Sequence, residues 1–178
     1  MKNIEVEARI FITKQQYKKL KKFFDKNAKF IKHDNQETHY FDLDEDIRIQ
    51  KNNYFAKIWF KKGKIHDDSR EEIEVKFAKE DFNKIAKIFK AVNFKTKIKW
   101  FRERYEYKWG SIIVDLDHTK GYGYILELEK ITRKSNSEKT YQELIEKIKN
   151  LELEITPKEE FAKKFKYYEK NWKRLIKE

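Results

Sequence analysis

The feature that most constrains this fold is a repeated alternation of charged and apolar residues. In "IEVEARI", residues 4–10, a two-residue period places the apolar side chains on one side of a strand and Glu5, Glu7 and Arg9 on the other. The same pattern returns in "DIRIQK", "EEIEVKF", "FRERYEY", "IVDLDH" and "ILELEKI". Each such strand has one apolar and one charged face, so the chain is predicted to form an antiparallel sheet whose two faces differ in chemistry.

The segments between these strands carry helical patterns. Apolar stripes at helical spacing predict helices over residues 13–27, 80–93, 137–153 and 156–178. Thr13 followed by Gln16, and Thr156 followed by Glu159, are typical capping pairs at helix starts. With about eight strands, four helices and no linker or repeat, the sequence predicts a single domain over residues 1–178, of α+β class.

Composition excludes several classes of protein. No stretch approaches the ~18 apolar residues of a membrane span, and none resembles a secretory leader, so a cytoplasmic protein without a membrane partner is expected. The absence of cysteine excludes thiolate metal sites. A net charge of +12 favours a polyanionic partner. The tryptophans form no RNA-binding signature and are predicted to pack in the core: Trp59, Trp100, Trp109 and Trp172.

Acidic residues occur as pairs, two positions apart, on four of the predicted strands. Each pair places two carboxylates about 7 Å apart along one side of its strand. One interpretation is a sheet with a solvated charged face. The other is a closed sheet whose helices cover the apolar outside, so that the charges point inward. Because unpaired buried charge is costly, that interior would need a metal ion for the carboxylates and a polyanion for the cations.

The order of these motifs carries a family resemblance. Glu5, Glu7 and Arg9 stand in an opening E-x-E-x-K motif, and "DHTKGYGYILELE" follows a closing motif that ends at Glu127 and Glu129. Between them lie Y-F-D at 40–42, Arg48, Lys61, E-x-E-x-K at 72–76 and R-x-R at 102–104. The ordered set resembles the CYTH domain of the triphosphate tunnel metalloenzymes. That group includes thiamine triphosphatases, inorganic triphosphatases and class IV adenylate cyclases.

The resemblance implies a closed eight-stranded antiparallel β-barrel, with helices packed on the outside and a triphosphate bound in the interior tunnel. It implies Mg²⁺ or Mn²⁺ as cofactor, with these metal ligands: Glu5, Glu7, Glu127 and Glu129. The phosphate-binding residues would be Arg9, Arg48, Lys61, Lys76, Arg102 and Arg104. The candidate catalytic residues are Glu74 and Glu72, as acceptors of a proton from the attacking water, and Arg9, near the reacting phosphate.

Two positions depart from the family pattern. Arg9 stands where lysine is usual, and its planar fork stays charged at all relevant pH. Gln50 stands where a second arginine is often found after Arg48, which removes one phosphate contact.

Three functions remain compatible with the sequence. The first is a metal-dependent hydrolase of inorganic tripolyphosphate, a nucleoside triphosphate or thiamine triphosphate. The alternative is an adenylate cyclase that converts ATP to cAMP and pyrophosphate. The third is a non-catalytic module that binds polyphosphate or an RNA 5′ end. Apart from such an RNA 5′ triphosphate, no nucleic-acid partner is expected, and both a monomer and a homodimer are compatible with the sequence.

Overall fold

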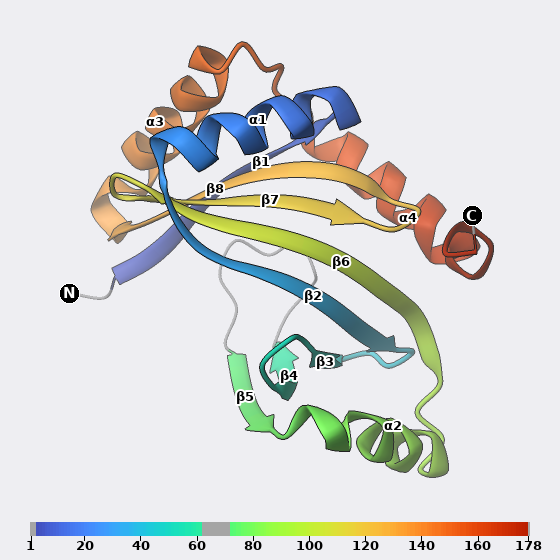
Figure 1. The fold of residues 1–178 in the computed structure, drawn as a ribbon. Coiled ribbons are helices and arrows are strands. Elements are labelled where there is room, and N and C mark those ends of the chain that lie inside the picture. Colours follow the sequence, from blue (N-terminus) through green and yellow to red (C-terminus); the bar gives the residue numbers. More distant parts are fainter. Residues whose placement is uncertain (1–2, 62–71, 178) are drawn as a thin grey trace. The chain divides into compact units, whose positions relative to one another are not determined.

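The structure, a computed structural model, describes residues 3–61 and 72–177 (Figure 1). The strands are β1 (Asn3–Ile12), β2 (Lys29–Phe41), β3 (Asp46–Lys51), β4 (Ala56–Lys61), β5 (Glu72–Phe77), β6 (Thr96–Trp109), β7 (Ile112–Thr119) and β8 (Gly123–Arg133). The helices are α1 (Lys14–Asn27), α2 (Phe82–Ala91), α3 (Ser137–Asn150) and α4 (Lys158–Leu175). None of these helices combines the length and the apolarity needed to cross a membrane.

The eight strands form one antiparallel sheet in the order β1-β8-β7-β6-β2-β3-β4-β5. This confirms the predicted α+β class and the antiparallel arrangement. The order of the described strands ends at β1 and β5 and does not close on itself, so the closed barrel remains a prediction. The chain divides into two compact units. The first unit comprises Met1–His33 with Glu103–Tyr168, and the second comprises Asp34–Arg102 with Glu169–Glu178.

The core of the first unit lies between one sheet face and two helices. Helices α1 and α3 cover the apolar face of β1, β8 and β7 (Figure 1). The buried side chains there include Ala8, Ile10, Phe24, Val114, Leu116, Leu126, Leu128, Leu144 and Ile148. Because charged residues alternate with these apolar ones, the same packing directs the charged side chains of each strand to the opposite face. The predicted covering of the apolar face by helices is confirmed for this unit.

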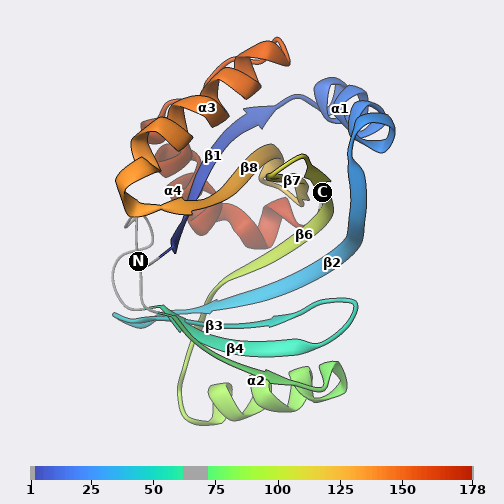
Figure 2. The same cartoon turned by 90° about the vertical axis from the view of Figure 1, so that its left-hand side faces the viewer.

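The second unit repeats the arrangement with α2. Phe41, Ile49, Ala56 and Phe82 form its buried cluster, and the ring centroid of Phe41 lies 4.6 Å from that of Phe89 on α2. Helix α2 runs along β3 and β4 in Figure 2. The residues that alternate with this cluster on β3 and β4 are therefore placed on the other face: Arg48, Gln50, Lys57 and Trp59.

The two predicted helix caps have different outcomes. The capping box of α1 is confirmed, since Thr13 Oγ1 accepts from the Gln16 backbone N–H at 3.1 Å and Gln16 Oε1 accepts from the Thr13 N–H at 2.7 Å. The predicted cap at Thr156 is wrong, because α4 begins at Lys158. The Thr156 hydroxyl instead accepts from the Phe11 backbone N–H at 2.9 Å, which ties the segment before α4 to β1.

The turn between β7 and β8 brings the closing motif into register. Gly121 and Gly123 have φ values of +72° and +123°, a region that glycine adopts at little cost. A Cβ on Gly123 would also lie 3.2 Å from Lys164 Nζ, a contact that this flexible side chain can relieve, so the backbone conformation is what favours glycine there. The turn sets the ladder in which Asp115 lies opposite Glu127.

Candidate functional site

Five carboxylates from β1, β7 and β8 form one cluster on the charged face of the first unit. In the ladders, Glu7 lies opposite Glu129, and Glu127 lies opposite Asp115. Oxygen atoms of Glu5, Glu7 and Glu129 all lie within 4.8 Å of one another, and so do those of Asp115, Glu127 and Glu129. Glu129 belongs to both groups and joins them into the carboxylate cluster.

The carboxylate cluster is electrostatically strained as it stands. Burial raises the pKa of Glu129 to about 9, and the charges of Glu127 and Asp115 add to this. Partial burial, together with the charge of Glu127, raises the pKa of Glu7 to about 7. Carboxylates that repel one another are neutralised by a divalent cation, and hard oxygen donors suit Mg²⁺ and Mn²⁺. The donor set therefore fits the predicted metal, with all four predicted ligands in one place.

Arg104 of β6 is held against this cluster by three acidic residues. Its Nε and Nη2 donate to the two carboxylate oxygens of Asp117, each at 2.7 Å, and Nη2 also donates to Glu127 Oε2 at 3.1 Å. Nη1 pairs with Asp115. Burial alone would lower the pKa of Arg104, but these carboxylates outweigh it and hold the pKa well above its ordinary value. In this structure Arg104, predicted to bind phosphate, neutralises the buried acids of β7 and β8.

Arg9 lies beside the same cluster and is more exposed. It faces Glu127 in the ladder, and its Nη1 lies 3.8 Å from Glu7 Oε1. Its guanidinium lies 5.0 Å from the ring centroid of Phe161 on α4. With 41% of its side chain exposed, Arg9 is accessible to solvent beside the carboxylates.

Two predicted phosphate-binding arginines lie in the second unit, and both have protein partners. Arg48 donates to both carboxylate oxygens of Asp46 at 2.6 Å, and its guanidinium lies 4.3 Å from the ring centroid of Tyr40. Arg102 donates from Nε and Nη2 to Gln36 Oε1, at 2.8 and 2.6 Å. These contacts fix both guanidinium planes on the charged face of the second unit.

Glu74 of β5 is bracketed by two lysines. Lys57 Nζ donates to its Oε2 at 2.6 Å, and Lys76 Nζ lies 3.4 Å from its Oε1. Burial alone would raise the pKa of Glu74, but the two lysines together lower it below its usual value. Glu74 is therefore ionised at neutral pH. The side chains of two further predicted residues, Lys61 and Glu72, lie outside the described part of the chain.

Gln50, the departure from the family pattern, is integrated into the sheet. Its Nε2 donates to Thr38 Oγ1 at 2.9 Å, and the residue is 8% exposed. Lys57 lies directly opposite Gln50 in the β3–β4 ladder. A cation thus stands on the neighbouring strand at the level where the sequence lacks the second arginine.

Sequence reasoning did not assign three of these side chains to the site. Asp115 and Asp117 were visible as a D-x-D pair, but only the ladder shows that Asp115 lies opposite Glu127. Lys57 alternates with Ile58 in the sequence, and nothing there distinguishes it from the many solvated lysines.

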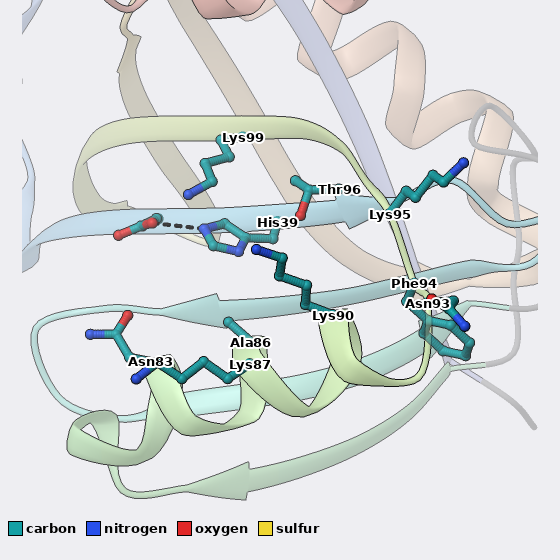
Figure 3. Close-up of a pocket in the computed structure, with 11 residues that line it drawn as sticks. His39, Asn83, Ala86, Lys87, Lys90, Asn93, Phe94, Lys95, Thr96 and Lys99 are labelled. Carbon is teal, nitrogen blue, oxygen red and sulfur yellow. Dashed lines mark hydrogen bonds and ion pairs between the residues drawn. The ribbon is translucent and has the colours of Figure 1, made fainter.

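A separate cavity of about 710 Å³ lies on the α2 side of the second unit (Figure 3). It is lined by lysines of α2 and β6, together with His39 and Glu37 of β2, whose side chains hydrogen-bond at 2.7 Å. His39 and Glu37 alternate with Thr38, which faces Gln50. The cavity therefore opens on the opposite face of β2 from Gln50, and its described lining contains none of the predicted site residues.

Comparison with known proteins agrees with these motifs. Residues 3–162 match the CYTH domain, so the chain belongs to the CYTH family. This family contains triphosphatases and adenylate cyclases.

One curated relative and several solved structures are similar to this chain. A protein of Methanocaldococcus jannaschii named "Putative adenylate cyclase MJ0240" is 34% identical over 164 residues, which cover 86% of this chain and 91% of that protein. A conserved hypothetical protein from Pyrococcus furiosus superposes with a TM-score of 0.69 at 24% identity, covering 85% of this chain and 92% of the other. The PH1012 protein from Pyrococcus horikoshii gives a TM-score of 0.69 at 24% identity, covering 87% and 96%. Both Pyrococcus structures therefore have the same fold as this chain.

Proposed function

We propose that this chain is a divalent-metal-dependent hydrolase of a triphosphate-containing substrate. The carboxylate cluster is the single observation that carries the proposal. Glu7 and Glu129 have raised pKa values, and oxygens of both lie within 4.8 Å of one another and of further carboxylates, which is the chemistry of a cation site. Membership of the CYTH family and the cationic side chains on the same sheet supply the reason for a phosphate-bearing substrate.

The proposed division of roles follows the chemistry of each side chain. Glu5, Glu7, Glu127 and Glu129 hold the metal, and Asp115 joins them as an additional ligand. Bound there, a divalent ion offsets charge on the phosphate oxygens. Arg104 orients the buried acids. In phosphoryl transfer, positioning and charge neutralisation supply most of the rate enhancement, so little covalent help is needed from the protein.

Phosphate binding is assigned to the cations of the opening motif and the second unit. Arg9 is proposed to contact the reacting phosphate, and Arg48, Lys61, Lys76 and Arg102 the remaining phosphates. Arg104 is already paired with Asp115, Asp117 and Glu127. It would contact a phosphate group only while it keeps these buried ion pairs. Among the described carboxylates, Glu74 is the proposed acceptor of the proton from the attacking water, since it is ionised at neutral pH. Glu72 stays the second candidate for that role.

Adenylate cyclase activity is the second candidate function. The observation that favours it is the 34% identical relative that bears the name "Putative adenylate cyclase MJ0240". The ribose 3′-hydroxyl of ATP would then replace water as the nucleophile, with pyrophosphate as the leaving group. The metal ligands and phosphate contacts would be the same, so these residues do not distinguish the two reactions.

Product identity tests the proposal. The full chain is incubated with tripolyphosphate, ATP or thiamine triphosphate, with Mg²⁺ or Mn²⁺, and phosphate, pyrophosphate and cAMP are resolved in one assay. Metal-dependent phosphate release that is lost in Glu129→Gln and kept in Glu143→Gln supports the hydrolase. Production of cAMP would assign the cyclase instead. Binding of tripolyphosphate without any product would reject both reactions and leave a phosphate-binding module.

A further inference from the structure

Trp59 carries a buried hydrogen-bond donor that finds no acceptor within residues 3–61 and 72–177. The residue is 5% exposed, and its indole N–H has no partner among the described residues. An unsatisfied buried donor destabilises the ligand-free protein, and native structures keep few of them. Trp172 shows the usual arrangement, because its indole N–H donates to the Lys97 carbonyl oxygen at 2.8 Å. Core packing therefore accounts for Trp172, but it leaves the N–H of Trp59 unexplained.

The surroundings of Trp59 are cationic. Lys57 Nζ lies 4.5 Å from the centroid of its ring, and the Arg48 guanidinium lies 5.6 Å from it. Arg48 is also its cross-strand partner in the β3–β4 ladder. Two cations beside an N–H that needs an acceptor favour an anion with several oxygens as the missing partner.

Lys57 places a cation next to position 50, where this chain has glutamine instead of a second arginine. It lies opposite the neutral Gln50, whose amide is engaged by Thr38. Lys57 and Trp59 are two residues apart on β4, so their side chains leave the same face of the strand. Glu74 holds the Lys57 ammonium at 2.6 Å in this structure, and its oxygens stand where a phosphate oxygen could substitute for them.

We propose that Lys57 and Trp59 form a phosphate-binding pair on β4, in which the ammonium and the indole N–H donate to oxygens of one phosphate group of the substrate. On binding, the Lys57 ammonium exchanges a Glu74 oxygen for a phosphate oxygen. The Lys57 ammonium lies 4.5 Å from the centroid of the indole ring, so one phosphate group can contact both side chains. The inference rests on the proposed function and adds two phosphate contacts to the arginines and lysines of the motifs.

The test measures affinity for the imido analogue of inorganic tripolyphosphate, in which bridging NH groups resist hydrolysis. Calorimetric titration of the full chain with Mg²⁺ present gives the dissociation constant. We expect Lys57→Met and Trp59→Phe each to weaken binding roughly 5- to 20-fold, as for the loss of one charge-assisted hydrogen bond. Since phenylalanine is smaller, benzothienylalanine at position 59 is the second variant. It keeps the ring size, replaces the N–H by sulfur, and should weaken binding to the same extent.

Matched controls separate lost phosphate contacts from lost packing or charge. Lys130→Met removes a lysine of similar exposure that donates to Glu143 at 2.8 Å, and Trp172→Phe removes an indole whose N–H already has a partner. Both should leave the dissociation constant within about twofold, as expected for residues outside the contact. An unchanged dissociation constant in Lys57→Met and in the benzothienylalanine variant, with tight binding by the original chain, would overturn the pair alone. Absence of binding by the original chain would overturn the proposed function, and the pair with it.

Discussion

Glu7 and Glu129 lie directly opposite one another in the β1–β8 ladder, and both carboxyl groups have raised pKa values. Like charges at opposed positions destabilise a sheet. The apolar faces of the same two strands are sealed by α1 and α3, so the register cannot slip to separate the acids without exposing the core. The fold thus holds a repulsive pair in place, which protonation or a bound cation would relieve.

The stability of the metal-free protein is predicted to fall as the pH rises from 6 to 9. The ordinary pKa of Glu129 is 4.5, and burial beside Glu127 raises it to about 9 in the folded protein. Below pH 4.5 the group is protonated in both states; between 4.5 and 9 only the unfolded chain releases the proton, so stability is progressively lost. Urea unfolding in EDTA should show a loss on the order of 4 kcal/mol over this range, at about 1.4 kcal/mol per pH unit, and Glu129→Gln should show a much flatter profile. Equal slopes would contradict the raised pKa.

Mg²⁺ or Mn²⁺ is predicted to raise the melting temperature. A cation that binds only the folded protein stabilises it by mass action. Because the ligands must be ionised, the increase should be larger at pH 8.5 than at pH 6.5. Differential scanning fluorimetry should show no increase for Glu127→Gln or Glu129→Gln, whereas Glu143→Gln on α3 should respond like the original chain. An equal response in all four proteins would place the ion elsewhere.

Arg104→Met is predicted to destabilise the protein strongly. The substitution leaves Asp115 and Asp117 buried, at 1% and 2% exposure, without the guanidinium that neutralises them. Breaking one side of a buried ion pair costs about 3–5 kcal/mol, which urea unfolding can measure. Adding Asp117→Asn should recover part of the loss. The exposed Arg133→Met serves as control and should change the free energy of unfolding by less than about 0.5 kcal/mol.

Glu74→Gln is predicted to lower turnover by about 100-fold or more while tripolyphosphate is still bound. An amide cannot accept the proton of the attacking water, but the substitution leaves Lys57 and Lys76 in place to contact phosphate. Steady-state kinetics and calorimetry on the same preparation separate the two effects, and the exposed Glu80→Gln is the control. Unchanged turnover would remove Glu74 from the catalytic role and leave it as the residue that holds Lys57.

The faces of the strands could be predicted from sequence because alternation has a period of two and the helices had to cover the apolar side. That argument placed Glu5, Glu7, Glu127 and Glu129 on one face, and the structure brings them together. Alternation alone did not show whether this charged face is a binding site or a solvated surface. The resemblance to the CYTH domain favoured the binding site.

Register and long-range hydrogen bonds could not be predicted from a single sequence. Asp115 became a candidate ligand only when the β7–β8 ladder set it opposite Glu127. Thr156 carried a local capping pattern, but its hydroxyl bonds to Phe11, 145 positions away in the chain. In both cases the deciding partner is distant in sequence, where local propensity carries no information.

The strict alternation along β1, β7 and β8 has a consequence for how this protein can change during evolution. Substitutions can alter one face while sparing the other, but removal of a single residue inside a strand would exchange the two faces beyond that point. In β8, such a deletion before Leu126 would turn its glutamates toward α1 and α3 and its leucines toward the ligand side. Insertions and deletions among relatives should therefore be confined to turns and helix ends, because the strands must keep their two-residue alternation of side chains.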